Sequence, residues 1–242
     1  MPAWGWVLMV ACALLVGFSK TALGNVALVA VAIMAWLLPA RDSTGVLLVM
    51  LFSGDIIAVS IYRRDVDWRL LARMIPPVLI GLAAGWLFLG YVDNTVLART
   101  IGIILLVLVG VGLWTQHASA DGLRGGRLAS TGYGALAGFT TMVANAGGPA
   151  MSLYLLAARF DKWRFLGTQA WFFFAVNVVK LPVSMSLGIV RPVTAALSAV
   201  LIPGVVVGAV IGRILIQRIN QKLFERLVMI LAAAAAVYLV IE

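Results

Sequence analysis

The sequence is poor in charge and in cysteine. Charged residues make up 11% of its 242 residues, where a soluble domain has about 25%, and apolar residues make up 63%. The single cysteine, Cys12, excludes an intrachain disulfide and any metal site built from several cysteines. We therefore expect an all-α polytopic membrane protein that carries no metal and no cofactor.

Long apolar runs fill most of the chain, and polar stretches that contain glycine interrupt two of them. Several runs approach the roughly 20 residues that cross a bilayer. The interruptions are 17–25, which reads Gly-Phe-Ser-Lys-Thr-Ala-Leu-Gly-Asn, and 138–149, which reads Gly-Phe-Thr-Thr-Met-Val-Ala-Asn-Ala-Gly-Gly-Pro. The runs beside them are short, which favours broken or re-entrant helices. Two such breaks at corresponding places in two halves indicate a transporter binding site.

The two halves repeat one plan of about five helical segments. Adding 121 to Gly17 reaches Gly138, and adding 127 to the pair Gly81 and Gly85 reaches Gly208 and Gly212. Because five is an odd number, the two repeats are expected to insert with inverted topology. We assign a first transmembrane repeat to residues 1–115, a cytoplasmic linker to 116–128 and a second transmembrane repeat to 129–242.

The positive charges sort onto one face of this topology. The loops 63–73, 116–128, 159–164 and 213–226 hold thirteen of the 18 Lys and Arg residues, and the opposite loops hold three. Cytoplasmic loops retain Lys and Arg, so the first face is expected to be cytoplasmic and both termini periplasmic, in a multi-pass protein of the inner membrane. The formal charge of +9 therefore does not indicate a nucleic-acid partner.

The candidate substrate-binding residues lie in the two breaks and in one later span. Lys20 and Lys180 are cations within the apolar pattern, and helix N-termini at the breaks would add positive dipole ends for an anion. Two simpler interpretations are that these polar residues only cap broken helices, and that Lys180 reaches to the outer interface. The full set is Ser19, Lys20, Thr21, Asn25, Thr140, Thr141, Asn145, Gly147, Gly148, Asn177 and Lys180.

Asp55 is the single carboxylate inside a predicted span, and it aligns with Asn177 at an offset of 122. Two roles compete for it. It is either a structural counter-ion to Lys20 or Lys180, or a proton carrier that couples protons to transport.

The two breaks, together with the stretch from Asn177 to Lys180 and the two helices rich in Pro and Gly, resemble the TauE/SafE sulfite exporter family. The second break keeps the glycine cluster Gly147-Gly148-Pro149, whereas the first is reduced to Gly24-Asn25. The resemblance implies two similar halves and the export of sulfur-containing anions such as sulfite or organosulfonates.

We therefore expect a secondary transporter for a small anion, not an enzyme. The sequence has no P-loop, so an ion gradient, the membrane potential or the substrate gradient must drive transport. The alternatives are an anion channel of the same fold, an intramembrane enzyme, and a membrane subunit without transport of its own. The expected partners are the small anion and the lipid bilayer, and a homodimer is compatible with this interpretation.

Overall fold

The computed structural model describes residues 3–97, 99–100, 103–104, 127–157, 160–220 and 223. This part of the chain is helical and contains no strand. Five helices are long and apolar enough to cross a membrane: α1, α3, α4, α8 and α9. The elements are α1 (Ala3–Thr21), η1 (Gly24–Val26), α2 (Ala27–Leu37), α3 (Ala40–Tyr62), α4 (Trp68–Tyr91), α6 (Arg127–Ala144), α7 (Gly148–Ala157), α8 (Lys162–Ser186) and α9 (Pro192–Arg218).

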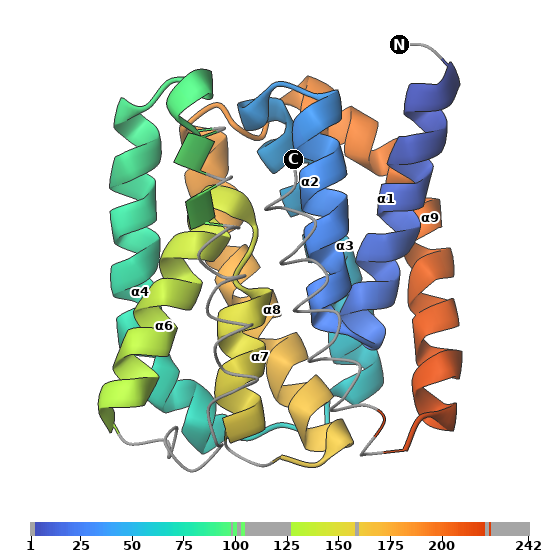
Figure 1. Cartoon of the computed structure of the whole chain (residues 1–242), viewed down its shortest axis with the longest axis vertical. Helices are drawn as coiled ribbons and strands as arrows, with labels where there is room; N and C mark the ends of the chain where they lie inside the picture. The colour runs from blue at the N-terminus through green and yellow to red at the C-terminus, as the bar shows by residue number, and fades with distance from the viewer. Residues whose placement is uncertain are drawn as a thin grey trace.

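Two helical hairpins enter the molecule from opposite ends (Figure 1). The N-terminal hairpin consists of α1 and α2, and the connection from α2 to α3 lies at the same end as the N-terminus. The second hairpin consists of α6 and α7, and it enters and leaves at the other end. Each short helix pair therefore turns back inside the molecule, while α3, α4, α8 and α9 run between the two ends.

Glycines allow close helix packing at equivalent places in the two halves. A Cβ on Gly17 of α1 would lie 1.9 Å from the carbonyl oxygen of Val205 in α9, and one on Gly138 of α6 would lie 2.3 Å from that of Val78 in α4. Gly208 packs in the same way on Leu14, and Gly81 on Ala135. The contacts correspond pairwise, because an offset of 121 relates the α1 residues to those of α6 and an offset of 127 relates the α4 residues to those of α9. The interfaces α1–α9 and α4–α6 are thus equivalent.

The ends of α4 and α9 are closed by equivalent basic residues. The guanidinium of Arg41 donates hydrogen bonds to the carbonyl oxygens of Leu89 (2.9 Å) and Val92 (2.7 Å). Lys162, which lies 121 residues further on, donates to the carbonyl oxygens of Ile216 (3.0 Å) and Ile219. Cations satisfy the unpaired carbonyls and the negative dipole at a helix C-terminus. Such matched contacts are those that two repeats related by a pseudo-twofold axis would make, and their inverted orientation in a membrane stays a prediction.

The helices extend further into both breaks than the sequence predicts. The first non-helical stretch begins after Thr21, so Lys20 lies in the last turn of α1 and not at the start of the following helix. Likewise α6 continues to Ala144. Gly and Thr have low helix propensities, but the free-energy cost is too small to end a helix that packs against neighbours on both sides.

Parts of the predicted organisation lie outside the described residues. These are most of the linker 116–128, most of the span 96–114, and nearly all of the last span, 223–241. Within the described part, α6 begins at Arg127, two residues before the predicted start of the second repeat.

Candidate functional site

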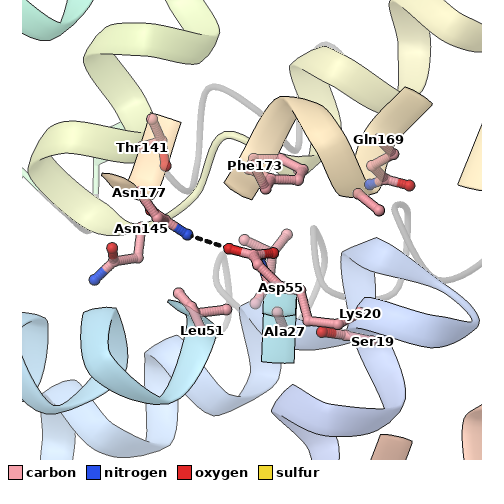
Figure 2. A pocket seen from close by; sticks show the side chains of 13 residues that line it. Ser19, Lys20, Ala27, Leu51, Asp55, Thr141, Asn145, Gln169, Phe173 and Asn177 are labelled. Atoms are coloured by element: carbon pink, nitrogen blue, oxygen red, sulfur yellow. Dashed lines mark hydrogen bonds and ion pairs between the residues drawn. The ribbon is translucent and has the colours of Figure 1, made fainter. Parts of the chain in front are cut away.

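A small cavity of about 30 Å³ lies where the two hairpins meet α3 and α8 (Figure 2). Seven of the residues predicted from the sequence line it: Ser19, Lys20, Asp55, Thr141, Asn145, Gly148 and Asn177. The remaining wall is formed by Ala27, Leu28, Leu51, Gln169, Ala170 and Phe173. Residues from both breaks and both central helices therefore share one cavity.

Equivalent positions of the two halves face each other across this cavity. α3 packs against α8, and each contributes two matched positions to the wall. The first residues of α2 and α7 also correspond and both line it, so the N-terminal ends of two helices border the same space. The matched pairs are Lys20 and Thr141, Ala27 and Gly148, Leu51 and Phe173, and Asp55 and Asn177.

Asp55 and Lys20 form an ion pair inside this cavity. Lys20 Nζ lies 2.6 Å from Asp55 Oδ1, and Asn177 Nδ2 donates to Asp55 Oδ2 at 2.6 Å. The ammonium of Lys20 also lies 4.6 Å from the centre of the Phe173 ring. Asp55 is fully buried, and a buried charge is tolerated only when it is paired and hydrogen-bonded. Of the two counter-ions considered for Asp55, the structure pairs it with Lys20.

Lys180 is buried behind the cavity wall and does not reach an interface. Its ammonium donates to Asn145 Oδ1 at 2.7 Å and to the carbonyl oxygen of Thr141. Asn145 in turn donates from Nδ2 to the carbonyl oxygen of Thr44 at 3.1 Å. Lys180 is 1% exposed, which contradicts the alternative of a lysine that reaches the outer interface. It holds the second break in place through neutral acceptors.

Besides Lys180, four of the predicted residues do not line the cavity. The hydroxyl of Thr21 donates to the carbonyl oxygen of Ala209 at 2.8 Å and so joins α1 to α9. Asn25 accepts from Ser152 at 3.4 Å, and Thr140 donates to Leu136 of its own helix at 2.7 Å. A Cβ on Gly147 would lie 2.9 Å from Thr141 Cβ, so this glycine permits close packing of the second break. These four side chains serve the architecture around the cavity.

Gln169 and Phe173 were not predicted from the sequence, although both line the cavity. They lie inside α8, among apolar residues, and no break marks them. A usable signal was present in the spacing, because residues 169, 173 and 177 follow one another at intervals of four and share one helix face. Asn177 is among the predicted residues, and the helix face that carries it also carries Gln169 and Phe173.

A comparison with known protein families identifies the class of this protein. A family model described as "Sulfite exporter TauE/SafE" matches residues 9–239, which is almost the whole chain. No curated protein and no solved structure matches it. The long apolar helices and this match identify a multi-pass membrane protein. The chain belongs to the sulfite exporter TauE/SafE family of membrane transporters.

Proposed function

We propose that the protein exports a small anion, sulfite or an organosulfonate, across the inner membrane and binds it in the cavity around Lys20. The observation that carries this proposal is the Lys20–Asp55 ion pair, which lies in a cavity that the first residues of α2 and α7 also line. An ammonium and two helix N-termini are suitable donors for an oxyanion.

The ion pair suggests how binding begins. The cavity of about 30 Å³ matches the volume of one water molecule, so an anion of several heavy atoms must widen it. The anion competes with Asp55 for the ammonium of Lys20. Once displaced, the Asp55 carboxylate is buried without its counter-ion, and the cheapest response is to take a proton from water. Asp55 is then the counter-ion of the empty site and the proton acceptor of the loaded one.

The ion pair in the cavity favours a carrier over a channel of the same fold. An ion pair at 2.6 Å closes the route through the site, and each passage of an anion must break and remake it. Export as the direction, the inner membrane as the location and the periplasmic position of both termini belong to the same proposal. They are supported by the family and by the distribution of Lys and Arg.

Counterflow in proteoliposomes tests the proposal. Vesicles loaded with unlabelled sulfite are diluted into a trace of labelled sulfite, and a carrier concentrates the label inside transiently because it exchanges one anion for another. We expect this overshoot with wild-type protein and none with empty vesicles. Uptake that equilibrates without an overshoot would indicate a channel, and no uptake of sulfite or of any organosulfonate would contradict the proposed substrate class.

A further inference from the structure

We propose that Gln169 and Asn177 select the substrate, and that the preferred substrate is a monoanion that also carries a hydrogen-bond donor. This inference rests on the proposed function of the cavity and assigns it a ligand class more closely. It starts from two amides of α8 that have hydrogen-bonding capacity to spare within the described residues: the buried carbonyl oxygen of Asn177 and the side chain of Gln169.

The first amide belongs to Gln169. Its side chain lines the cavity and is 6% exposed, and no hydrogen bond joins it to another described residue. Figure 2 shows it on the α8 side of the cavity, across from Ser19 and Lys20. Its polar atoms are not fully buried, so they remain accessible from the cavity and a bound ligand can take the place of water there. The N–H groups of Gln169 are suited to an oxygen of the anion that Lys20 holds.

The second amide belongs to Asn177, and it leaves an acceptor free. Its Nδ2 donates to Asp55, which orients the carbonyl oxygen away from the carboxylate. That oxygen, Oδ1, is buried and has no partner among the described residues. A fully deprotonated oxyanion offers only acceptors and would leave it unsatisfied. A ligand with an O–H or N–H group would satisfy it, and sites of this kind reject analogues that lack the donor.

The charges set the preferred charge of the ligand. Lys20 and Lys180 are two cations and Asp55 is one anion, so the cluster has one formal positive charge in excess. At the start of binding, while Asp55 is still ionised, a monoanion neutralises this excess. A dianion would bring a second negative charge into a buried site that has no further cation among the described cavity residues. Hydrogen sulfite and hydroxyl-bearing sulfonates fulfil both conditions.

The two amides lie eight residues apart on one face of α8, with Phe173 between them. This spacing is two helical turns, or roughly 11–12 Å along the axis. Lys20 and Asn177 bond to the two oxygens of the Asp55 carboxylate, so a small ligand held by Lys20 lies within reach of Asn177. Gln169 lies further along the same face, beyond Phe173.

A pair of probes that differ in one hydroxyl tests the inference without any mutation. Ethanesulfonate and 2-hydroxyethanesulfonate are both monoanions, and sulfate serves as the dianion. Each is titrated into the purified wild-type protein by calorimetry. We expect 2-hydroxyethanesulfonate to bind about tenfold more tightly than ethanesulfonate, and sulfate to bind more weakly than both.

Variants then assign the preference to the two amides. Asn177→Leu should reduce the difference between the two sulfonates to less than about twofold, and Gln169→Leu should weaken both sulfonates to a similar degree. The control is Thr140→Val, since this hydroxyl bonds within its own helix and lies outside the cavity. It should leave both affinities and their ratio unchanged.

The outcomes separate this inference from the proposed function. Equal affinity of the wild-type protein for both sulfonates, or tightest binding of sulfate, overturns the inference and leaves anion transport standing. If sulfite and all three probes fail to bind, the proposed function fails as well. A preference that persists in Asn177→Leu overturns the role of Asn177.

Discussion

The side-chain amide of Asn177 donates a hydrogen bond to Asp55 Oδ2 at 2.6 Å, and these two residues, 122 positions apart, are equivalents of each other in the two halves of the chain. Equivalent residues meet only where the two halves meet. The pair therefore marks the centre of the molecule, and the cavity beside it is built from matched positions of both halves. The charges of the cavity are not repeated in the second half. Asp55 corresponds to the neutral Asn177, and Lys20 corresponds to the neutral Thr141.

Replacing Asp55 with Asn should uncouple transport from protons. The variant keeps the size of the side chain and removes the group that takes the proton when the anion binds to Lys20. We expect proton-driven flux to be lost while sulfite counterflow persists, and sulfite to bind at least as tightly because no carboxylate competes for Lys20. A pH dye inside proteoliposomes measures the first quantity and labelled sulfite the second. Proton movement that survives in the variant would leave Asp55 as a structural counter-ion only.

Replacing Lys20 or Lys180 with Met should weaken anion binding. Lys20 loses a charge-assisted bond to the anion, and Lys180 loses the bonds that hold Asn145 and Thr141 at the cavity. A loss of about 1.5–3 kcal/mol, roughly ten- to a hundredfold in affinity, is expected for each by calorimetric titration. Arg at either position should not restore binding, because its planar fork does not replace a compact ammonium.

Lys162→Met is the matched control for these two lysine variants. Lys162 is also a buried lysine bonded to carbonyl oxygens, but it lies at the end of α9, outside the cavity. It should lower thermal stability and leave affinity unchanged. If all three Met variants lose affinity equally, the effect reports damaged folding and not a specific role of Lys20 and Lys180 at the cavity.

Replacing Gly17 with Ala should destabilise the protein although only one methyl group is added. Its Cβ would lie 1.9 Å from the carbonyl oxygen of Val205, so α1 and α9 must separate, at a cost of about 1–3 kcal/mol. Gly5→Ala is the control on the same helix, since nothing lies within 4 Å of its Cβ. It should be neutral or stabilising by about 0.5–1 kcal/mol, because Gly in a helix is less favourable than Ala. Equal melting temperatures for both variants would contradict this packing.

Cysteine labelling tests the orientation of the helices. Val66 lies between α3 and α4 on the predicted cytoplasmic side, and Thr95 lies beyond the end of α4 on the opposite side. In a Cys12→Ala background, Val66→Cys should react with an impermeant maleimide only in inverted vesicles, and Thr95→Cys only in intact spheroplasts. Labelling of both from one side would overturn the inverted-repeat topology.

Asp67, at the start of α4, should make stability sensitive to acid. Burial raises the pKa of Asp67, but hydrogen bonds from the Leu70 N–H and from Arg164, together with the charge of Arg164, outweigh it, so the pKa lies below its ordinary value. A lowered pKa stabilises the folded state above the unfolded value of 3.8, and this contribution is lost as the pH falls through the folded pKa. Below about pH 4 the melting temperatures of wild type and Asp67→Asn should therefore converge. A difference that stays constant with pH would contradict the assignment.

The sequence predicts the helices and the region of the site well, and predicts individual roles less well. Apolar length alone locates α3, α4, α8 and α9, because the cost of unpaired backbone in a bilayer leaves helices as the solution. Glycine and polar residues signal a break only approximately, since packing against neighbouring helices decides where each helix ends. That is why Lys20 is helical. Gln169 went undetected because its importance arises from what surrounds it in space, and its spacing of eight residues from Asn177 is the one mark that the sequence gives it.

The helix interfaces α1–α9 and α4–α6 each join one half of the chain to the other, and this has a consequence for synthesis. The contact of α6 with α4 is between neighbours in the order of translation, whereas α1 leaves the ribosome about 170 residues before α9 begins. At about 5–20 residues per second, α1 waits roughly 10–35 seconds in the membrane with the face around Gly17 uncovered. Two interfaces of the same design therefore form at different times. The later one leaves a surface of small residues open to wrong partners and to membrane proteases until the chain is nearly complete.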